Sequence, residues 1–242
     1  KKQMSISIKE GPSLKVIDIL KEGIFRVEFN QTMDYTDLEK IGEIPLPKYI
    51  NRLAEKEIDD ILYQTVFSDK YGAVASPTAG LHFTEQLVEK IKAKGALWIP
   101  ITLYVDWGTF RPIRVEDYRK HEIHREIYEI SEESAREINH CITEKRRILC
   151  VGTTSVRTVE TAMDESGIIR SGRGETGLYI YPGYSFKLID GMVTNFHMPD
   201  STLILLVMAF GGEEGIRKAY VHAVKEKYRF FSYGDAMLIL KD

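Results

Sequence analysis

The chain has 242 residues, of which 43% are hydrophobic and 29% are charged, and its formal net charge is -3. This composition is ordinary for a soluble globular protein, with enough residues for one large domain or two smaller ones. The slightly acidic balance excludes a protein that is basic over its whole surface, so any contact with a polyanion must come from a local patch.

Compartment and topology follow from two further features. Two cysteines, Cys141 and Cys150, are too few for a disulfide framework and favour the reducing cytoplasm. The longest apolar run, "STLILLVMAF", is shorter than the ~20 residues that span a bilayer, and no signal peptide is recognisable, so no membrane association is expected. Because the chain opens inside a strand-like stretch without methionine, we expect a further segment to precede it.

Residues 1–48 are predicted to be rich in β-strands. The stretches "MSISIKEG", "LKVIDILKEG" and "IFRVEFN" alternate in polarity and end in Gly or Asn, which is typical of hairpins. Two prolines in "EIPLPKYI" then interrupt the pattern and indicate a domain boundary.

From residue 49 onward, strands are predicted to alternate with helices. Strands are expected in "GAVASP", "LWIPITLYV", "RILCVG" and "LYIYPG", and helices in "RLAEKEIDDILYQTVF", "TEQLVEKIKAKG", "EESAREINHCITEKR" and "SVRTVETAMDESG". Such alternation favours an α/β domain with many parallel neighbouring strands. The stretch "GRGETG" matches the dinucleotide pattern, but no helix follows it, so we interpret it as a flexible loop.

Three segments share the order strand, hydroxyl-rich loop, helix. They are "AVASPTAGLHFTEQL", "ILCVGTTSVRTVE" and "MVTNFHMPDSTLILL". Ligands of α/β proteins bind at such junctions, because side chains converge there and free helix N–H groups point outward. Helix capping by Thr84, Ser155 and Ser201 (or Asp200) explains one oxygen in each loop. The surplus hydroxyls in "GTTS" and "SPTAG" indicate a ligand site.

Charged and titratable residues near these loops allow more than one interpretation. His82 and His197 are either structural histidines or proton-transfer groups. Arg157, in the first turn of a helix, either pairs with Glu160 or holds an anionic ligand group. The stretch "HEIHRE" does not predict a metal site, since strand alternation puts its first histidine on the opposite face from its second histidine and last glutamate.

Two stretches, "WGTFRPIR" and "YRFFSYGDAM", mix aromatic residues with arginine. Their rings are either buried core or faces that stack on unpaired bases or receive a sulfonium cation. Five basic residues and one acidic residue fall between Arg217 and Arg229, which is either a solvated helix face or an RNA-binding surface.

Taken together, "YQTVF", "SPTAGLHFT", "WGTFRPI", "VGTTSVRT", "YPGYSFK", "TNFHMPDSTL" and "YRFFSYGDAM" resemble the S-adenosylmethionine:tRNA ribosyltransferase-isomerase family of queuosine biosynthesis. The motifs occur in family order from about Pro45 to the end. The resemblance implies a barrel-like α/β catalytic domain, residues 49–242, carrying an inserted small β-barrel domain whose latter part is residues 1–48. The family often reads "LHVGxGTF" where this chain has "LYVDWGTF", with Tyr104 and Asp106 at the differing positions.

The reaction implied by the resemblance uses S-adenosylmethionine as a ribosyl donor. The ribosyl group is transferred and isomerised onto 7-aminomethyl-7-deazaguanine at the wobble position of tRNA, giving epoxyqueuosine-tRNA, adenine and methionine. S-adenosylmethionine is a co-substrate, and neither a metal nor another cofactor is implied. The family suggests a cytoplasmic monomer.

The implied site residues fall into three groups. Candidates for proton transfer are His82, His197 and Asp235. Candidates for holding S-adenosylmethionine are Pro77, Thr78, Gly80, Gly152, Thr153, Thr154, Ser155, Arg157 and Asn195. Candidates for binding RNA are Arg111, Arg114, Tyr184, Lys187, Arg229 and Phe231. The alternatives are a non-catalytic RNA-binding module and an α/β enzyme acting on a small anionic metabolite.

Overall fold

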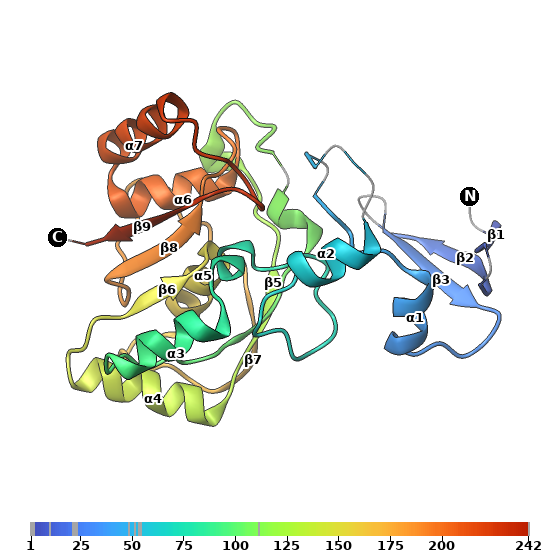
Figure 1. Ribbon diagram of the computed structural model, residues 1–242, viewed down its shortest axis with the longest axis horizontal. Coiled ribbons are helices and arrows are strands. Elements are labelled where there is room, and N and C mark those ends of the chain that lie inside the picture. The colour runs from blue at the N-terminus through green and yellow to red at the C-terminus, as the bar shows by residue number, and fades with distance from the viewer. Residues whose placement is uncertain are drawn as a thin grey trace. The chain divides into compact units, whose positions relative to one another are not determined.

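The computed structural model divides into two compact units, Lys1–Ile44 and Pro45–Asp242, coloured along the chain in Figure 1. The residues it describes are 3–9, 11–20, 24–47, 49–50, 52, 55–110 and 112–241, without the side chains of 56, 57, 107 and 110. Within these ranges, none of the helices combines the length and the apolar character that crossing a bilayer requires.

The smaller unit is an antiparallel sheet followed by a helix. Its strands are β1 (Ser5–Ser7), β2 (Ser13–Ile19) and β3 (Phe25–Phe29), in the order β1-β2-β3. Helix α1 (Tyr35–Ile41) begins at Asp34, whose side chain accepts a hydrogen bond from the backbone N–H of Asp37. Val16 is buried in this unit, whereas Phe25 is half exposed.

The larger unit contains two three-stranded sheets. One has β4 (Thr102–Tyr104), β5 (Glu126–Ile130) and β7 (Gly172–Thr176) in the order β4-β5-β7, and the other has β6 (Leu149–Val151), β8 (Gly191–Asn195) and β9 (Ala236–Leu240) in the order β6-β8-β9. Among the strand pairs of the described residues, β6 with β8 is parallel and the rest are antiparallel. The mixed α/β class is therefore confirmed, but the expectation of many parallel neighbours was wrong. Alternation along the chain does not fix which strands pair.

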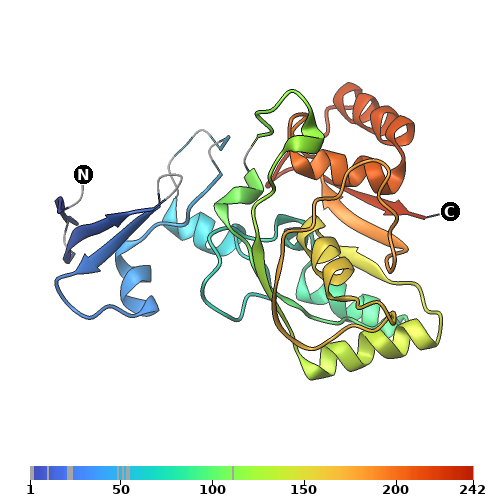
Figure 2. The same ribbon diagram turned by 180° about the vertical axis from the view of Figure 1, so that it is seen from behind.

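Six α-helices of the described residues belong to this unit. They are α2 (Lys56–Leu62), α3 (Glu85–Ala93), α4 (Glu132–Thr143), α5 (Thr153–Ala162), α6 (Thr202–Gly211) and α7 (Glu213–Lys225), with the short 3-10 helices η2 (Thr78–His82), η3 (Trp107–Phe110) and η4 (Tyr118–Lys120). Seen from behind, α6 and α7 lie together at one end of the unit and α4 at the other (Figure 2).

The core of the larger unit lies where α5 and α6 pack on the β6-β8-β9 sheet. Val156 of α5, Met192 of β8 and Val207 of α6 are fully buried there. Because α6 comes from the sequence "TLILLVMAFG", it offers apolar side chains to neighbours on several sides, as expected of a helix inside a core. This packing holds rigid the two elements, α5 and β8, from which the loops described below emerge.

Several local features differ from those expected from the sequence. The stretch "GRGETG" contains strand β7, which pairs with β5, and is not a flexible loop. Gly174 permits this pairing because a Cβ there would come within 2.5 Å of the Tyr128 side chain on the neighbouring strand. The stretches "GAVASP" and "LYIYPG" form no strand. Thr84 and Ser201 cap α3 and α6 as predicted, whereas the N-cap residue of α5 is Gly152 and not Ser155.

Candidate functional site

All three hydroxyl-rich loops meet at one pocket of the larger unit. Predicted residues that line it are Pro77, Thr78, Gly152, Thr153, Thr154, Ser155, Asn195, His197 and Phe231. Lining residues that the sequence analysis did not select include Tyr49, Ser76, Thr109, Thr194 and Ser232. Ser76 and Thr109 lay inside quoted motifs, whereas nothing in the sequence linked Tyr49 to Ser232, with which it shares a hydrogen bond.

The convergence of two of the loops follows from the β6–β8 pair, which is parallel. In the β6–β8 pair, Val151 lies opposite Val193, so the carboxyl ends of the two strands meet at the same sheet edge. The backbone N–H of Gly152 extends this pairing by donating to the carbonyl of Val193 at 2.8 Å. The third loop joins through the Thr78 hydroxyl, which donates to Asn195 Oδ1 at 3.1 Å.

The amino end of α5, from Thr153 to Ser155, lines the pocket. Gly152, the residue before the helix, has a φ of 92°, and no side chain among the described residues caps it. The Ser155 hydroxyl turns back and donates to the Val151 carbonyl at 2.8 Å. The first turn therefore keeps the partial positive charge of an uncapped helix end, which suits a carboxylate or phosphate.

Asn195, in the third loop, connects the first loop to the turn that carries Phe231. Its Nδ2 donates to the Phe231 carbonyl at 3.1 Å, which fixes the amide orientation because a carbonyl can only accept. The same nitrogen lies 3.0 Å from His82 Nε2, so this Nε2 accepts and the imidazole carries its proton on Nδ1. Burial lowers the pKa of His82, with the nearby Asp235 carboxylate opposing that effect. His82 is thus a neutral histidine that orients Asn195, and it stands behind the pocket wall.

His197 is the one predicted proton-transfer residue, among those described, that lines the pocket. Its Nε2 shares a hydrogen bond of 2.7 Å with the Thr194 hydroxyl, and its backbone N–H donates to the Tyr220 hydroxyl at 2.7 Å. Burial lowers the pKa of His197 to about 4. The imidazole is therefore neutral at physiological pH.

Asp235 lies outside the pocket lining and is engaged by Arg229. Its carboxylate accepts from the Arg229 backbone N–H at 2.7 Å and from the guanidinium at 3.0 Å. These hydrogen bonds lower the pKa of Asp235. The pair closes the tight turn that carries Phe231.

Arg157 points away from the pocket into a buried ion pair. Its guanidinium donates to Glu126 at 2.6 Å and to the carbonyls of Leu178 and His124 at 2.9 and 3.1 Å. Of the two interpretations of Arg157, the pair with Glu160 was wrong. Glu160 instead accepts hydrogen bonds from the backbone N–H groups of residues 187 and 188 and from the hydroxyl of residue 184. Since Arg157 is 2% exposed, its geometry supports a structural contact and not the expected one with a ligand.

Phe231 occupies a strained backbone position at the pocket. Its φ is 71°, a left-handed conformation that bulky residues adopt rarely. The position is held at both ends, since its N–H donates to the Phe196 carbonyl and its carbonyl accepts from Asn195. The ring lies 4.9 Å from that of Tyr49. A strained aromatic residue fixed in this way is typical of a functional site.

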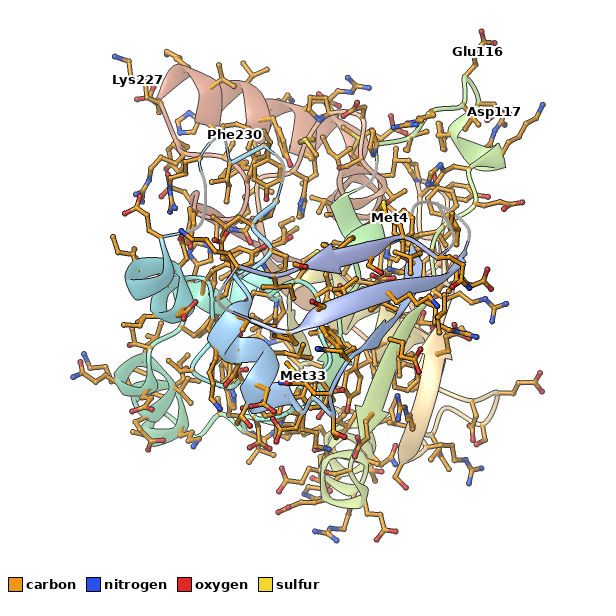
Figure 3. The ribbon with its side chains drawn as sticks, turned by 90° about the vertical axis from the view of Figure 1, so that its right-hand side faces the viewer. Met4, Met33, Glu116, Asp117, Lys227 and Phe230 are labelled. Carbon is orange, nitrogen blue, oxygen red and sulfur yellow. The ribbon has the colours of Figure 1, made fainter. Side chains whose placement is uncertain are left out.

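The remaining predicted RNA-binding residues differ in their exposure. Arg114 and Lys187 are exposed, whereas Tyr184 is half-buried with its hydroxyl on Glu160. Arg111 lies outside the described residues. Figure 3 shows Lys227 projecting from the end of α7, while acidic side chains at residues 116 and 117 project from the segment before η4.

Metal ligation gains no support from side-chain positions. Across the part of the chain that the structure describes, no group of three or more His, Cys, Asp or Glu side chains is arranged to hold an ion. His124 and Glu126 of "HEIHRE" do meet, with His124 Nε2 lying 3.3 Å from Glu126 Oε1, but an arginine neutralises the carboxylate.

Fold and pocket together define a mixed α/β protein with a hydroxyl-lined pocket at the carboxyl ends of β6 and β8. The chain belongs to the queuosine biosynthesis protein family, whose sequence profile matches residues 1–239.

Two relatives and one solved structure illustrate the likeness. A protein of Trichlorobacter lovleyi named S-adenosylmethionine:tRNA ribosyltransferase-isomerase is 46% identical over 98% of this chain and 69% of its own length. One of the same name from Thermoanaerobacter sp. is 53% identical over 84% of this chain and 59% of its own length. The crystal structure of S-adenosylmethionine tRNA ribosyltransferase from Thermotoga maritima is 33% identical with a TM-score of 0.55, covering 99% of this chain and 66% of that one. The chain therefore spans between 59% and 69% of the length of these relatives.

Proposed function

We propose that this protein transfers and isomerises the ribosyl group of S-adenosylmethionine onto 7-aminomethyl-7-deazaguanine at the wobble position of tRNA. The products are epoxyqueuosine-tRNA, adenine and methionine. The observation that carries the proposal is the meeting of all three hydroxyl-rich loops at one pocket. It is made in a chain 46% identical to a relative named S-adenosylmethionine:tRNA ribosyltransferase-isomerase.

The proposal also covers the roles of the two units, the compartment and the oligomeric state. The larger unit is the barrel-like catalytic domain, and the smaller unit is the latter part of an inserted β-barrel domain. The protein acts as a cytoplasmic monomer, with S-adenosylmethionine as co-substrate and neither metal nor other cofactor.

S-adenosylmethionine binds with its carboxylate at the amino end of α5. The free N–H groups around Thr153 and Thr154 match the negative charge of the carboxylate. The ribose then lies toward Thr78 and Asn195, and Phe231 offers an aromatic face to a purine or to the flipped wobble base.

The chemistry needs one base and one acid near the ribose. The sulfonium acidifies the adjacent C5′ hydrogens, and His197 is the pocket residue able to accept such a proton, since its low pKa leaves it unprotonated at neutral pH. Adenine must gain a proton as it leaves. His82 supports this chemistry as a positioning residue, since its Nε2 lone pair already accepts from Asn195. Asp235 acts indirectly, through the turn that it closes with Arg229.

The tRNA anticodon loop binds through cations and rings at the surface. Arg114 and Lys187 are exposed and free to approach phosphates, as Arg111 and Arg229 are expected to do. Each phosphate neutralised on single-stranded RNA contributes about -0.7 to the slope of log affinity against log salt. Tyr184 and Phe231 supply the aromatic faces.

Adenine release tests the proposal. Purified protein is incubated with S-adenosylmethionine and with tRNA carrying the aminomethyl-deazaguanine, with unmodified tRNA, or without RNA. Adenine appearing with the modified tRNA alone supports ribosyl transfer. Equal release in all three reactions points to hydrolysis of a small metabolite, and tRNA binding without release points to an RNA-binding module.

A further inference from the structure

Three of the hydroxyl groups that line the pocket, those of Thr78, Thr109 and Ser155, donate their protons to acceptors of the protein. Thr109 Oγ1 donates to Glu126 Oε1 at 2.6 Å, and an ionised carboxylate can only accept. Thr78 donates to Asn195 Oδ1 at 3.1 Å, and Ser155 donates to a backbone carbonyl at 2.8 Å. Each oxygen therefore presents lone pairs, and no proton, to a ligand.

Thr109 is the most firmly fixed of these hydroxyls. Glu126 is 1% exposed and also accepts from Arg157 at 2.6 Å. Although burial would raise the pKa of Glu126, the hydrogen bonds from His124 and Thr109 and the charge of Arg157 outweigh it and hold the pKa below its usual value. The carboxylate stays ionised, so the Thr109 proton cannot turn toward the pocket.

The packing around this carboxylate leaves it little room to move. His124 Nε2 lies 3.3 Å from Glu126 Oε1 and 3.4 Å from Thr109 Oγ1. The His124 ring covers Gly108, where a Cβ would come within 2.1 Å of the ring. The Thr109 backbone N–H donates to the Asp106 carbonyl at 3.2 Å. Supported positions of this kind are what ligand recognition requires.

We propose that these three acceptor oxygens select a ligand by its hydrogen-bond donors, with Thr109 as the specificity-determining residue that receives a ribose hydroxyl of S-adenosylmethionine. Glu126 is a positioning residue that acts through Thr109. The inference rests on the function proposed above and deepens it. A vicinal diol matches acceptors spaced around one pocket, whereas the carboxylate of the same ligand goes to the N–H groups of α5.

Binding affinities separate this assignment from a structural role. Thr109→Val removes the hydroxyl at nearly constant volume, and Thr109→Ser keeps it. Thr161→Val is the matched control, because Thr161 shares a hydrogen bond of 2.7 Å with Thr176 away from the pocket. Calorimetry is run with S-adenosylmethionine and with its 2′-deoxy and 3′-deoxy analogues, and urea unfolding checks that each variant is folded.

We expect Thr109→Val to weaken S-adenosylmethionine binding about tenfold, the effect of one hydrogen bond, while Thr109→Ser and Thr161→Val bind as wild type does. One of the deoxy analogues should bind wild type and Thr109→Val equally, since it lacks the ribose hydroxyl that hydrogen-bonds to Thr109. If Thr109→Val does not fold, Thr78→Val replaces it, with the same expectation of a loss that one deoxy analogue abolishes.

Two results overturn the inference. Unchanged binding in the valine variants excludes their oxygens as acceptors, and an equal loss with all three ligands excludes the ribose hydroxyls. Failure of wild type to bind S-adenosylmethionine at all overturns the proposed function instead.

Discussion

His197→Gln should remove a defined part of the pH dependence of folding. Burial lowers the pKa of His197 from 6.5 to about 4, so the unfolded chain binds a proton at this residue between these values and the folded protein does not. A group with a depressed folded pKa of this kind makes stability fall as the pH drops from about 6.5 toward 4. Glutamine keeps a polar group for Thr194 but does not titrate.

The magnitude follows from the width of that window. A pH of 5 is about 1.5 units below the pKa of His197 in the unfolded chain and still above its pKa in the folded protein. Each pH unit in this window changes the free energy of unfolding by about 1.4 kcal/mol. Wild type should therefore lose about 2 kcal/mol more than the variant between pH 7 and pH 5.

Urea unfolding of both proteins at pH 7, 6 and 5 measures this difference. His82 and His121 also have pKa values lowered by burial, so both proteins keep a residual slope and only its difference reports on His197. Parallel pH profiles for wild type and variant would refute a buried neutral His197.

Three further substitutions test the supports of the site. Gly152→Ala should lower the free energy of unfolding by about 1–3 kcal/mol in urea, because a φ of 92° strains any residue with a Cβ; an unchanged midpoint would contradict that backbone geometry. Glu126→Gln should lower the free energy of unfolding by about 3–5 kcal/mol, because it leaves Arg157 as an uncompensated buried charge. A thermal midpoint equal to that of wild type would exclude the ion pair between Arg157 and Glu126. Gly108→Ala should lower the free energy of unfolding by about 1–3 kcal/mol, because its Cβ displaces the His124 ring. Histidine NMR signals in the variant identical to those of wild type would disprove this displacement.

The sequence predicted the place of the site better than the roles of its residues. Junctions of strand, loop and helix follow from local patterns, and the carboxyl ends of paired parallel strands meet at one edge, so the meeting of the loops at Gly152 and Asn195 was accessible. Thr78 joins them without the strand that was expected before it, through its hydrogen bond to Asn195. Helix starts at Thr84 and Ser201 were equally local, since a cap needs only a hydroxyl beside a free N–H.

Long-range partners were out of reach of such patterns. Arg157 pairs with Glu126, 31 positions away and on a different element, rather than with Glu160 in the same helix. The role of His82 depends on which way the Asn195 amide faces, and that is fixed by the Phe231 carbonyl. Such contacts depend on tertiary packing, which periodicity and spacing do not encode.

The most direct test of the central claim is a crystal structure of the protein with S-adenosylmethionine bound. The account predicts density in the pocket, with the ligand carboxylate within hydrogen-bond distance of the N–H groups that open α5 and a ribose hydroxyl on Thr109. Ligand density elsewhere on the protein, with this pocket unchanged, would contradict it.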